Sequence, residues 1–270
     1  MLLVLAALTV LLHTAGAPGV AADSTAMWPQ TAEQVMQPSA ARTVEPVQMP
    51  SVETEEPKSE PEPEPEPEPE QSVVVPASDP VEDTYFEDAV FLGDSRTEGF
   101  YLYSGLKSGD YYYSVGATVE SVFSKKVWQT DKGKVPLLDA MAEAPAGKVY
   151  VMLGVNELGW PRTETYYHQY AKLIDRVRED HPGAEVVLES LLPVSAKQEA
   201  KKTYVNNGRI QEYNAIIKTL AEEKRCWYLD VAEAVTGEDG CLRADLTFDG
   251  VHLNTAGCKV WLDYLRTHSV

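Results

Sequence analysis

From residue 85 onward, short apolar runs alternate with segments in which apolar residues recur every three or four positions. The apolar runs have the length of strands and cover residues 89–92, 111–114, 148–153, 185–190 and 226–230. Strand-length apolar runs that alternate with amphipathic helices are typical of a parallel sheet wrapped by helices. We therefore expect one α/β domain of the three-layer, flavodoxin-like type, with a five-stranded parallel sheet.

The boundaries of three helices can be placed from capping and breaking residues. One helix carries tyrosines and aliphatic residues at helical spacing and should stop at the His-Pro-Gly sequence of residues 181–183. A second helix should begin near Asn206. The last one should begin at Asn254 or Thr255, since either side chain can cap a helix.

The N-terminal segment, residues 1–22, has the pattern of an export signal. Residues 2–12 are an uninterrupted apolar run, short for a membrane span but typical of a signal peptide, and Val20-Ala21-Ala22 suits cleavage by a signal peptidase. The usual positively charged start is missing, so a cleaved signal peptide and an uncleaved membrane anchor both stay open. Both alternatives place the protein outside the cytoplasm, extracellular or at the cell surface.

Residues 23–84 have the composition of a linker. They hold 12 of the 18 prolines and no Leu, Ile, Phe, Tyr or Gly. Such a segment buries too little apolar surface to offset the entropy lost on ordering, so we expect it to be disordered. The strict Pro-Glu alternation of residues 60–70 predicts a stiff, extended spacer. The folded domain is then expected to cover residues 85–270.

Charge is divided unevenly between these two parts. The linker has 15 acidic and 2 basic residues, hence −13 of the net −19, and the domain has 27 acidic and 21 basic residues, hence −6. A mildly acidic domain on a strongly acidic linker argues against nucleic acid as a partner.

Candidate chemistry gathers at the ends of the predicted strands and ahead of the last helix. Ser95, Gly116 and Asn156 each follow a strand, so all three should meet at one rim of the sheet, where ligands bind in folds of this kind. His252 is the one histidine of five that lies in a loop just before a helix with an acid, Asp249, three residues earlier. Such an acid can bind one imidazole nitrogen and leave the other to take the proton of Ser95.

The same residues include donors for a developing oxyanion. The backbone N–H groups of Ser95 and Gly116 and the side-chain amide of Asn156 are suited to that role. Taken singly, each motif also has an ordinary structural explanation: a helix-capping serine, a strand-to-helix turn, a loop histidine. We expect Asp94 to brace the turn before Ser95, and Asn214 to brace a loop as a buried amide.

Several further residues have no assigned role. Arg96, Trp160 and residues 111–113 are expected around the rim. The three cysteines, Cys226, Cys241 and Cys258, form an odd count without metal-binding spacing. They are either small buried residues or include a Cys241–Cys258 disulfide.

These motifs, in this order, resemble the SGNH, or GDSL-type, esterase family. Gly93-Asp94-Ser95 resembles the first block of that family, Gly116 the second and Gly154-Val155-Asn156 the third, and Asp249 with His252 resembles the fifth. The resemblance covers residues 85–270 and implies the three-layer α/β/α fold, with no metal or organic cofactor. It implies Ser95 as nucleophile, His252 as base and Asp249 as orienting acid. The implied oxyanion hole consists of Ser95, Gly116 and Asn156.

Two positions depart from the family pattern, and both bear on substrate preference. Arg96 stands where the family usually has Leu, and Glu157 stands where it usually has Asp. With its Pro/Glu-rich spacer, the chain is most similar to exported GDSL-like proteins of Gram-positive bacteria. That similarity implies a monomeric esterase acting on a small-molecule or glycan ester, acetyl esters first.

Three other functions stay open at this point. The first is an O-acyltransferase acting on cell-surface glycan, although no acyl-donor motif is evident. The second is a non-catalytic glycan-binding wall protein. The third is a metal-dependent phosphoesterase that uses Asp94, Asn156, Asp249 and His252 as ligands, which the small number of histidines disfavours.

Overall fold

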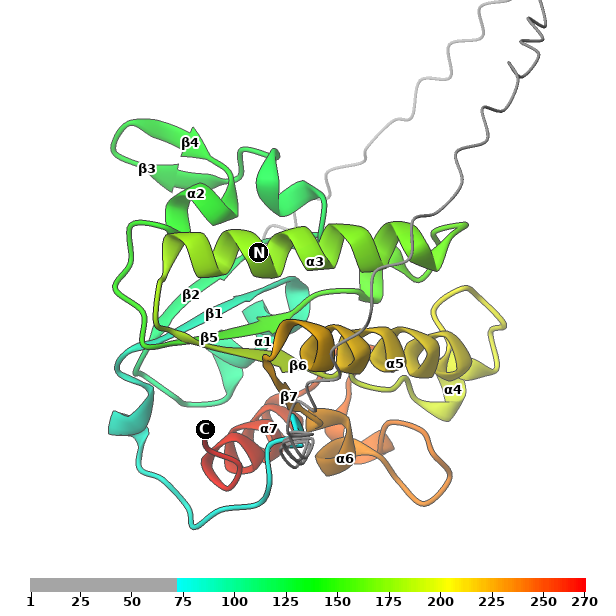
Figure 1. The fold of residues 1–270 in the computed structure, drawn as a ribbon. Helices are drawn as coiled ribbons and strands as arrows, with labels where there is room; N and C mark the ends of the chain where they lie inside the picture. The colour runs from blue at the N-terminus through cyan, green and yellow to red at the C-terminus, as the bar shows by residue number, and fades with distance from the viewer. Residues whose placement is uncertain (1–71) are drawn as a thin grey trace, which may run out of the picture. The chain divides into compact units, whose positions relative to one another are not determined.

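The centre of the molecule is a five-stranded parallel sheet. A computed structural model of the chain describes residues 72–270, and its sheet has the strand order β2-β1-β5-β6-β7 (Figure 1). The strands are β1 (Ala89–Gly93), β2 (Asp110–Tyr113), β5 (Lys148–Met152), β6 (Glu185–Glu189) and β7 (Trp227–Leu229). Every neighbouring pair runs parallel. The predicted α/β class and all five predicted strands are confirmed.

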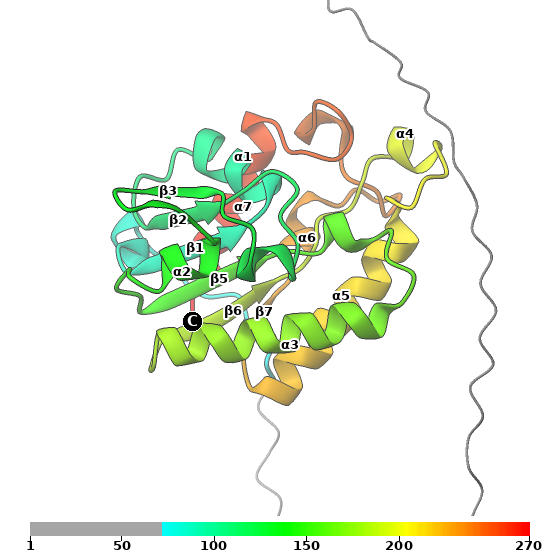
Figure 2. The ribbon, with the colours of Figure 1, turned by 90° about the horizontal axis from the view of Figure 1, so that it is seen from above.

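Helices cover both faces of this sheet. The long helices α3 (Thr163–Asp180) and α5 (Asn207–Lys224) lie together on one face. The other face is covered by α1 (Ser95–Tyr103), α6 (Val231–Val235) and α7 (Thr255–Arg266). Figure 2 shows the sheet between the two helical layers. The expected three-layer arrangement is confirmed.

Shorter elements connect these layers. They are α2 (Leu137–Met141), α4 (Ala196–Glu199) and the 3-10 turns η1 (Asp83–Phe86), η2 (Ser121–Phe123), η3 (Val155–Glu157) and η4 (Ala244–Leu246). The turn η3 directly follows β5, and η4 precedes the loop that carries His252.

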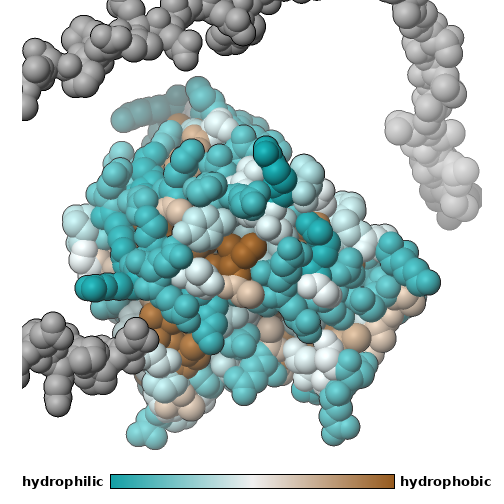
Figure 3. All heavy atoms as spheres, turned by 45° about the vertical axis from the view of Figure 1, so that its right-hand side comes forward, coloured by the Kyte–Doolittle hydropathy of each residue, from teal (hydrophilic) through white to brown (hydrophobic). Residues whose placement is uncertain are grey.

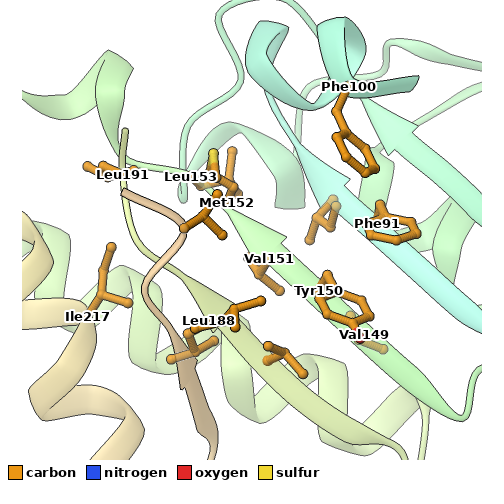
Figure 4. Close-up of a cluster of buried hydrophobic side chains, with 14 of the residues drawn as sticks. Phe91, Phe100, Val149, Tyr150, Val151, Met152, Leu153, Leu188, Leu191 and Ile217 are labelled. Carbon is orange, nitrogen blue, oxygen red and sulfur yellow. The ribbon is translucent and has the colours of Figure 1, made fainter. Parts of the chain in front are cut away.

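The centres of the strands are mostly apolar because both faces of the sheet are buried. All five residues of β1 are buried, and the ring of Phe91 stacks on Tyr111 and on Tyr150, with centroids 4.8 and 4.9 Å apart. Figure 4 shows Phe91, Tyr150 and Leu188 in this cluster of buried side chains. The rigid core fixes the positions of the loops that follow each strand.

The helix ends agree with the capping signals. Helix α3 ends at Asp180, one residue before His181. The Asn206 side chain accepts the Arg209 N–H at the start of α5, and the Asn254 side chain accepts the Gly257 N–H at the start of α7. Asn254, rather than Thr255, is therefore the cap of the last helix.

An antiparallel hairpin, β3 (Trp128–Thr130) with β4 (Gly133–Val135), is absent from the predicted elements. Its strands are only three residues long and partly exposed. They mix Gln, Thr, Gly and Lys with few apolar residues. A hairpin of this kind has no apolar run from which a strand could be recognised.

The start of the folded domain also differs from the prediction. Val74 forms a parallel bridge with Tyr228 of β7, and Val75 is buried. The Ser78 N–H donates to Thr267 O at 2.7 Å. The predicted boundary at residue 85 is therefore wrong, because residues from Val73 on already pack against β7 and α7.

The export segment, residues 1–22, and the linker up to residue 71 lie outside the described residues, so those predictions stay predictions. Within the described part, no helix is both long enough and apolar enough to span a membrane. Cys226, Cys241 and Cys258 are all free, with Cys226 and Cys258 buried. The alternative of a Cys241–Cys258 disulfide is therefore wrong.

Candidate active site

Ser95 lies at the carboxyl end of β1, as the first residue of α1. The Asp94 side chain caps this helix by accepting the Arg96 N–H at 2.8 Å. A Cβ at Gly93 would collide with the Thr97 side chain and with Met152 O, so the turn requires glycine there. The Gly-Asp-Ser sequence thus places the Ser95 hydroxyl at the rim of the sheet, and the expected bracing role of Asp94 is confirmed.

His252 is held by a tight turn that begins at Asp249. One oxygen of the Asp249 carboxylate accepts the N–H groups of Val251 and His252, both at 2.8 Å. The other oxygen lies 2.7 Å from Nδ1 of His252. Gly250, at φ +91°, gives the turn its left-handed residue, and a Cβ there would collide with the Ser195 hydroxyl. The turn therefore fixes the plane of the imidazole ring.

The ring in turn reaches the serine. His252 Nε2 lies 2.9 Å from Ser95 Oγ. Because Nδ1 faces a carboxylate, it carries the proton and donates to Asp249, which leaves Nε2 to accept the Ser95 O–H. The structure thus brings together Ser95, His252 and Asp249 in one hydrogen-bonded line.

The charge state of Asp249 suits this arrangement. Burial acts to raise the pKa of Asp249, but hydrogen bonds from the backbone and ring of His252 and from Val251 outweigh it and hold the pKa below its ordinary value. The residue is a carboxylate at neutral pH. A carboxylate at this position stabilises the imidazolium that forms whenever Nε2 takes a proton.

Two backbone N–H groups at the rim lack a protein acceptor. Neither the Ser95 N–H nor the Gly116 N–H finds an acceptor among residues 72–270. Gly116 has φ +74°, and nothing lies within 4 Å of the place a Cβ would occupy. Both N–H groups are available to a substrate oxygen.

Asn156 lies at the same rim, but its amide is already engaged. Its Nδ2 donates to Ala117 O at 2.9 Å and to the Asp94 carboxyl at 3.2 Å. To serve as a third oxyanion donor, the amide must share or release the longer of these bonds. Gly154 lies in the turn before Asn156 with φ +144°. A Cβ at this position would collide with the Tyr166 hydroxyl, so the turn requires glycine there.

These groups line a cavity of about 610 Å³. Five of the exposed large apolar side chains of the described residues also line it: Leu102, Tyr103, Val115, Tyr204 and Phe248. The Phe248 ring lies parallel to the His252 ring, with centroids 6.0 Å apart. In Figure 3, which brings the right-hand side of Figure 1 forward, hydrophobic patches stand out on an otherwise hydrophilic surface.

The residues expected around the rim are placed differently. Arg96 is buried, and its Nη1 donates to Leu192 O at 3.1 Å. Tyr111 is part of the core, and Tyr112 and Tyr113 pack against Trp128. Neither Trp160 nor any of these tyrosines lines the cavity. The prediction of a rim role is therefore wrong for the tyrosines and Trp160. Arg96 adjoins the cavity from a buried position.

Asn214 braces a loop, as expected. Its side chain accepts the N–H of Leu191 at 2.7 Å and donates to Leu191 O at 2.9 Å.

The phosphoesterase alternative needs a cluster of metal ligands. Among residues 72–270, no group of three or more His, Cys, Asp or Glu side chains is arranged to hold a metal ion.

The aromatic side chains that line the cavity are the residues of this site that the sequence did not reveal. Tyr103 could have been found, because eight residues along a helix return a side chain to the face that carries Ser95. Phe248 directly precedes Asp249 and could have been noted for that reason. Tyr204 lies in a loop where no periodicity indicates its direction.

Comparison with known proteins gives a family match over most of the domain. Residues 91–260 match the GDSL-like Lipase/Acylhydrolase family. No curated protein matches the chain.

Solved structures share the fold at low sequence identity. One is a Streptococcus pneumonia protein named for platelet activating factor, with 24% identity, TM-score 0.56, and coverage of 66% of this chain and 81% of that one. Another is a GDSL-like lipase from Bacteroides thetaiotaomicron, with 19% identity, TM-score 0.50, and coverage of 71% and 88%.

Proposed function

Because this chain belongs to the GDSL-like lipase/acylhydrolase family and is a serine ester hydrolase, we propose that it removes short acyl groups, acetyl first, from carbohydrate esters. The proposed route is an acyl-serine intermediate on Ser95. The observation that carries the proposal is the hydrogen-bonded line from Asp249 through His252 to Ser95 Oγ at the wall of an open cavity.

In the acylation half, Ser95 Oγ attacks the ester carbonyl carbon while His252 Nε2 takes the hydroxyl proton. The carbonyl oxygen becomes an oxyanion, which the Ser95 and Gly116 N–H groups bind, with Asn156 as the third donor. When the tetrahedral intermediate collapses, the bond from carbon to the alcohol oxygen breaks. His252 gives its proton to that oxygen, and the sugar alcohol leaves.

In the deacylation half, a water molecule takes the place of the alcohol. His252 Nε2 removes a proton from the water, whose oxygen attacks the acyl carbon of acyl-Ser95. The same donors bind the second oxyanion. Collapse releases the carboxylic acid and returns the proton from His252 to Ser95 Oγ, which restores the enzyme.

The cavity walls support carbohydrate as the part of the substrate that carries the ester. Tyr103, Tyr204 and Phe248 present exposed aromatic surface beside the nucleophile. Flat aromatic faces pack well against the C–H faces of sugar rings, and Tyr adds a hydroxyl that can bond a sugar oxygen.

The proposed site of action is outside the cytoplasm, with the domain carried on the acidic spacer. The apolar run at residues 2–12 and the Pro-Glu repeat at residues 60–70 support this proposal. Fractionation of expressing cells tests it, because the chain should be found in the medium or at the surface. Recovery from the cytoplasm alone would contradict it.

A substrate panel tests the function. The full chain should hydrolyse p-nitrophenyl acetate faster than the octanoate and should release acetate from acetylated xylan. Tyr204→Ala should raise KM for acetylated xylan several-fold and leave p-nitrophenyl acetate kinetics unchanged. Tyr101→Ala is the matched control, since Tyr101 is exposed but does not line the cavity. A preference for octanoate, or equal KM values for all three proteins on xylan, would contradict the proposal.

A further inference from the structure

Two separate segments must be in register for the oxyanion donors to converge. Gly116 lies in residues 114–119, after β2, and Asn156 lies in the turn η3, after β5. One direct link between them is a carboxyl group. Oε1 of Glu157 accepts the Val119 N–H at 2.6 Å, and the Asn156 amide bonds Ala117 O nearby. The Glu157 side chain is fully buried.

We propose that Glu157 is a positioning residue that holds the Gly116 segment and the Asn156 turn together for oxyanion binding, and that it does so as the protonated acid. This inference rests on the proposed function. It concerns one of the two positions at which the chain departs from the family pattern.

The surroundings of Glu157 disfavour a negative charge. Asp94 faces it from the β1–α1 turn, Tyr166 and Tyr170 from α3, and Tyr213 from α5. The Tyr213 hydroxyl donates to the backbone oxygen of Glu157 rather than to its carboxyl. The second carboxyl oxygen, Oε2, is buried without a partner. The tyrosines are neutral at these pH values, and the charge that acts on the pKa of Glu157 is the negative charge of Asp94.

The buried guanidinium of Arg96 is matched by Asp94. Arg96 follows Asp94 in sequence, acts on it electrostatically, and donates its backbone N–H to it. Asp94 also accepts from the Asn156 amide. Because two buried carboxyls that lie close together disfavour a second negative charge, we expect one of them to keep its proton. Burial raises the pKa of both carboxyls, but at Asp94 the charge and the backbone N–H of Arg96 oppose that rise, whereas at Glu157 only backbone N–H groups oppose it.

The direction of the pKa agrees with this assignment. Burial raises the pKa of Glu157 to about 8, the backbone N–H groups of Val119, Asn156 and Glu157 itself work against that rise, and the charge of Asp94 adds to it. Above that pH a second buried negative charge would form next to Asp94, close to the place where the oxyanion develops. The Gly116 segment and the oxyanion would both be destabilised, so kcat should fall reversibly.

Three full-length variants separate the possibilities. Glu157→Gln keeps the shape and the acceptor for Val119 but is neutral at every pH. Glu157→Ala removes the link. Glu189→Gln is the matched control, because Glu189 is also buried with a pKa raised to about 8 by burial, yet it bonds Trp261 and touches neither segment. Circular dichroism at pH 7 confirms that each variant is folded.

The expected results concern kcat against pH on p-nitrophenyl acetate. The wild type and Glu189→Gln should lose activity above about pH 8, and Glu157→Gln should keep it to higher pH. Glu157→Ala should lower kcat at pH 7 by about 10-fold or more, with KM little changed. An alkaline limb in Glu157→Gln that coincides with the wild type, or a wild-type kcat in Glu157→Ala, would overturn the proposal.

Two measurements that need no substrate keep this inference separate from the proposed function. The Val119 amide should exchange with deuterium faster in Glu157→Ala than in the wild type, while Glu157→Gln should protect it. In protein labelled with ¹³C at its carboxyl groups, the NMR signal of Glu157 is identified as the one that is absent from Glu157→Gln. In the wild type this signal should titrate near pH 8. If the protein hydrolyses no ester, the proposed function is refuted. The exchange of the Val119 amide and the titration of Glu157 still test whether Glu157 holds the two segments together. Unchanged exchange in Glu157→Ala, or titration of the Glu157 signal near pH 4.5, would overturn the positioning role.

Discussion

Replacing Glu189 by glutamine should remove a pH dependence from the stability of the fold. The Glu189 carboxyl lies at the end of β6 inside the core, 2% exposed, where its hydrogen bond comes from Trp261 Nε1 at 2.9 Å. Burial raises its pKa from 4.5 to about 8, while the Trp261 bond lowers it. Between these values the folded chain binds a proton that the unfolded chain has released.

The sign and size of the effect follow from this difference. Because the unfolded state binds fewer protons, the free energy of unfolding falls as pH rises, by about 1.4 kcal/mol per pH unit for one group. The stabilisation is complete below pH 4.5 and is lost by the time pH passes 8. From pH 5 to pH 8 the wild type should therefore lose roughly 3 to 4 kcal/mol through Glu189 alone. Glutamine has no such loss.

Urea unfolding of the full chain, followed by far-ultraviolet circular dichroism from pH 5 to pH 8.5, measures this directly. Glu157 contributes a similar slope to both proteins and cancels in the difference. The unfolding free energy of Glu189→Gln minus that of the wild type should rise steadily with pH. A constant difference over this range would refute the assignment of a buried, protonated Glu189.

The remaining predictions concern the site and the boundary of the domain. Asp249→Asn should lower kcat by about 10²- to 10⁴-fold, because the amide no longer selects the tautomer with a proton on Nδ1; a pH–rate profile with wild-type kcat would contradict this. Asn156→Ala should lower kcat by about 10²- to 10³-fold with little change in KM. If steady-state kinetics show instead that kcat is unchanged and that kcat/KM falls only because KM rises, the oxyanion role is refuted. Deleting residues 72–84 should cost about 2 kcal/mol or more from the burial of Val75, and an unchanged thermal unfolding midpoint would contradict that contribution.

The features that could be predicted share a local cause. A strand buried on both faces is apolar where it is buried, so β1 and residues 149–152 of β5 were visible as uninterrupted runs. Asn206 and Asn254 were visible because helix caps need side-chain acceptors. Ser95, Asp249 and His252 were visible because few residue types support nucleophilic catalysis, and because their order along the chain matched that of a known family.

The features that were missed depend on packing between distant segments or lack an apolar pattern. Arg96 looks like a surface residue in the sequence, yet the start of α1 directs it under the site, where Leu192 O accepts from it. Val74 reads as part of the linker, and only the exposed edge of β7 gives it a partner. The β3–β4 hairpin has no apolar period of its own. For Arg96 and Val74 the decisive contact lies far away along the chain, where local pattern carries no information.

The most direct test of the central claim is to trap the covalent intermediate. The full-length wild type and Ser95→Ala are mixed with p-nitrophenyl acetate, quenched in acid within the first turnovers, and analysed by intact mass and by peptide mapping. The wild type should carry one acetyl group on Ser95, and Ser95→Ala should carry none while kcat/KM falls by about 10³-fold or more. An acetyl group on another residue, or a Ser95→Ala variant as active as the wild type, would contradict catalysis through Ser95.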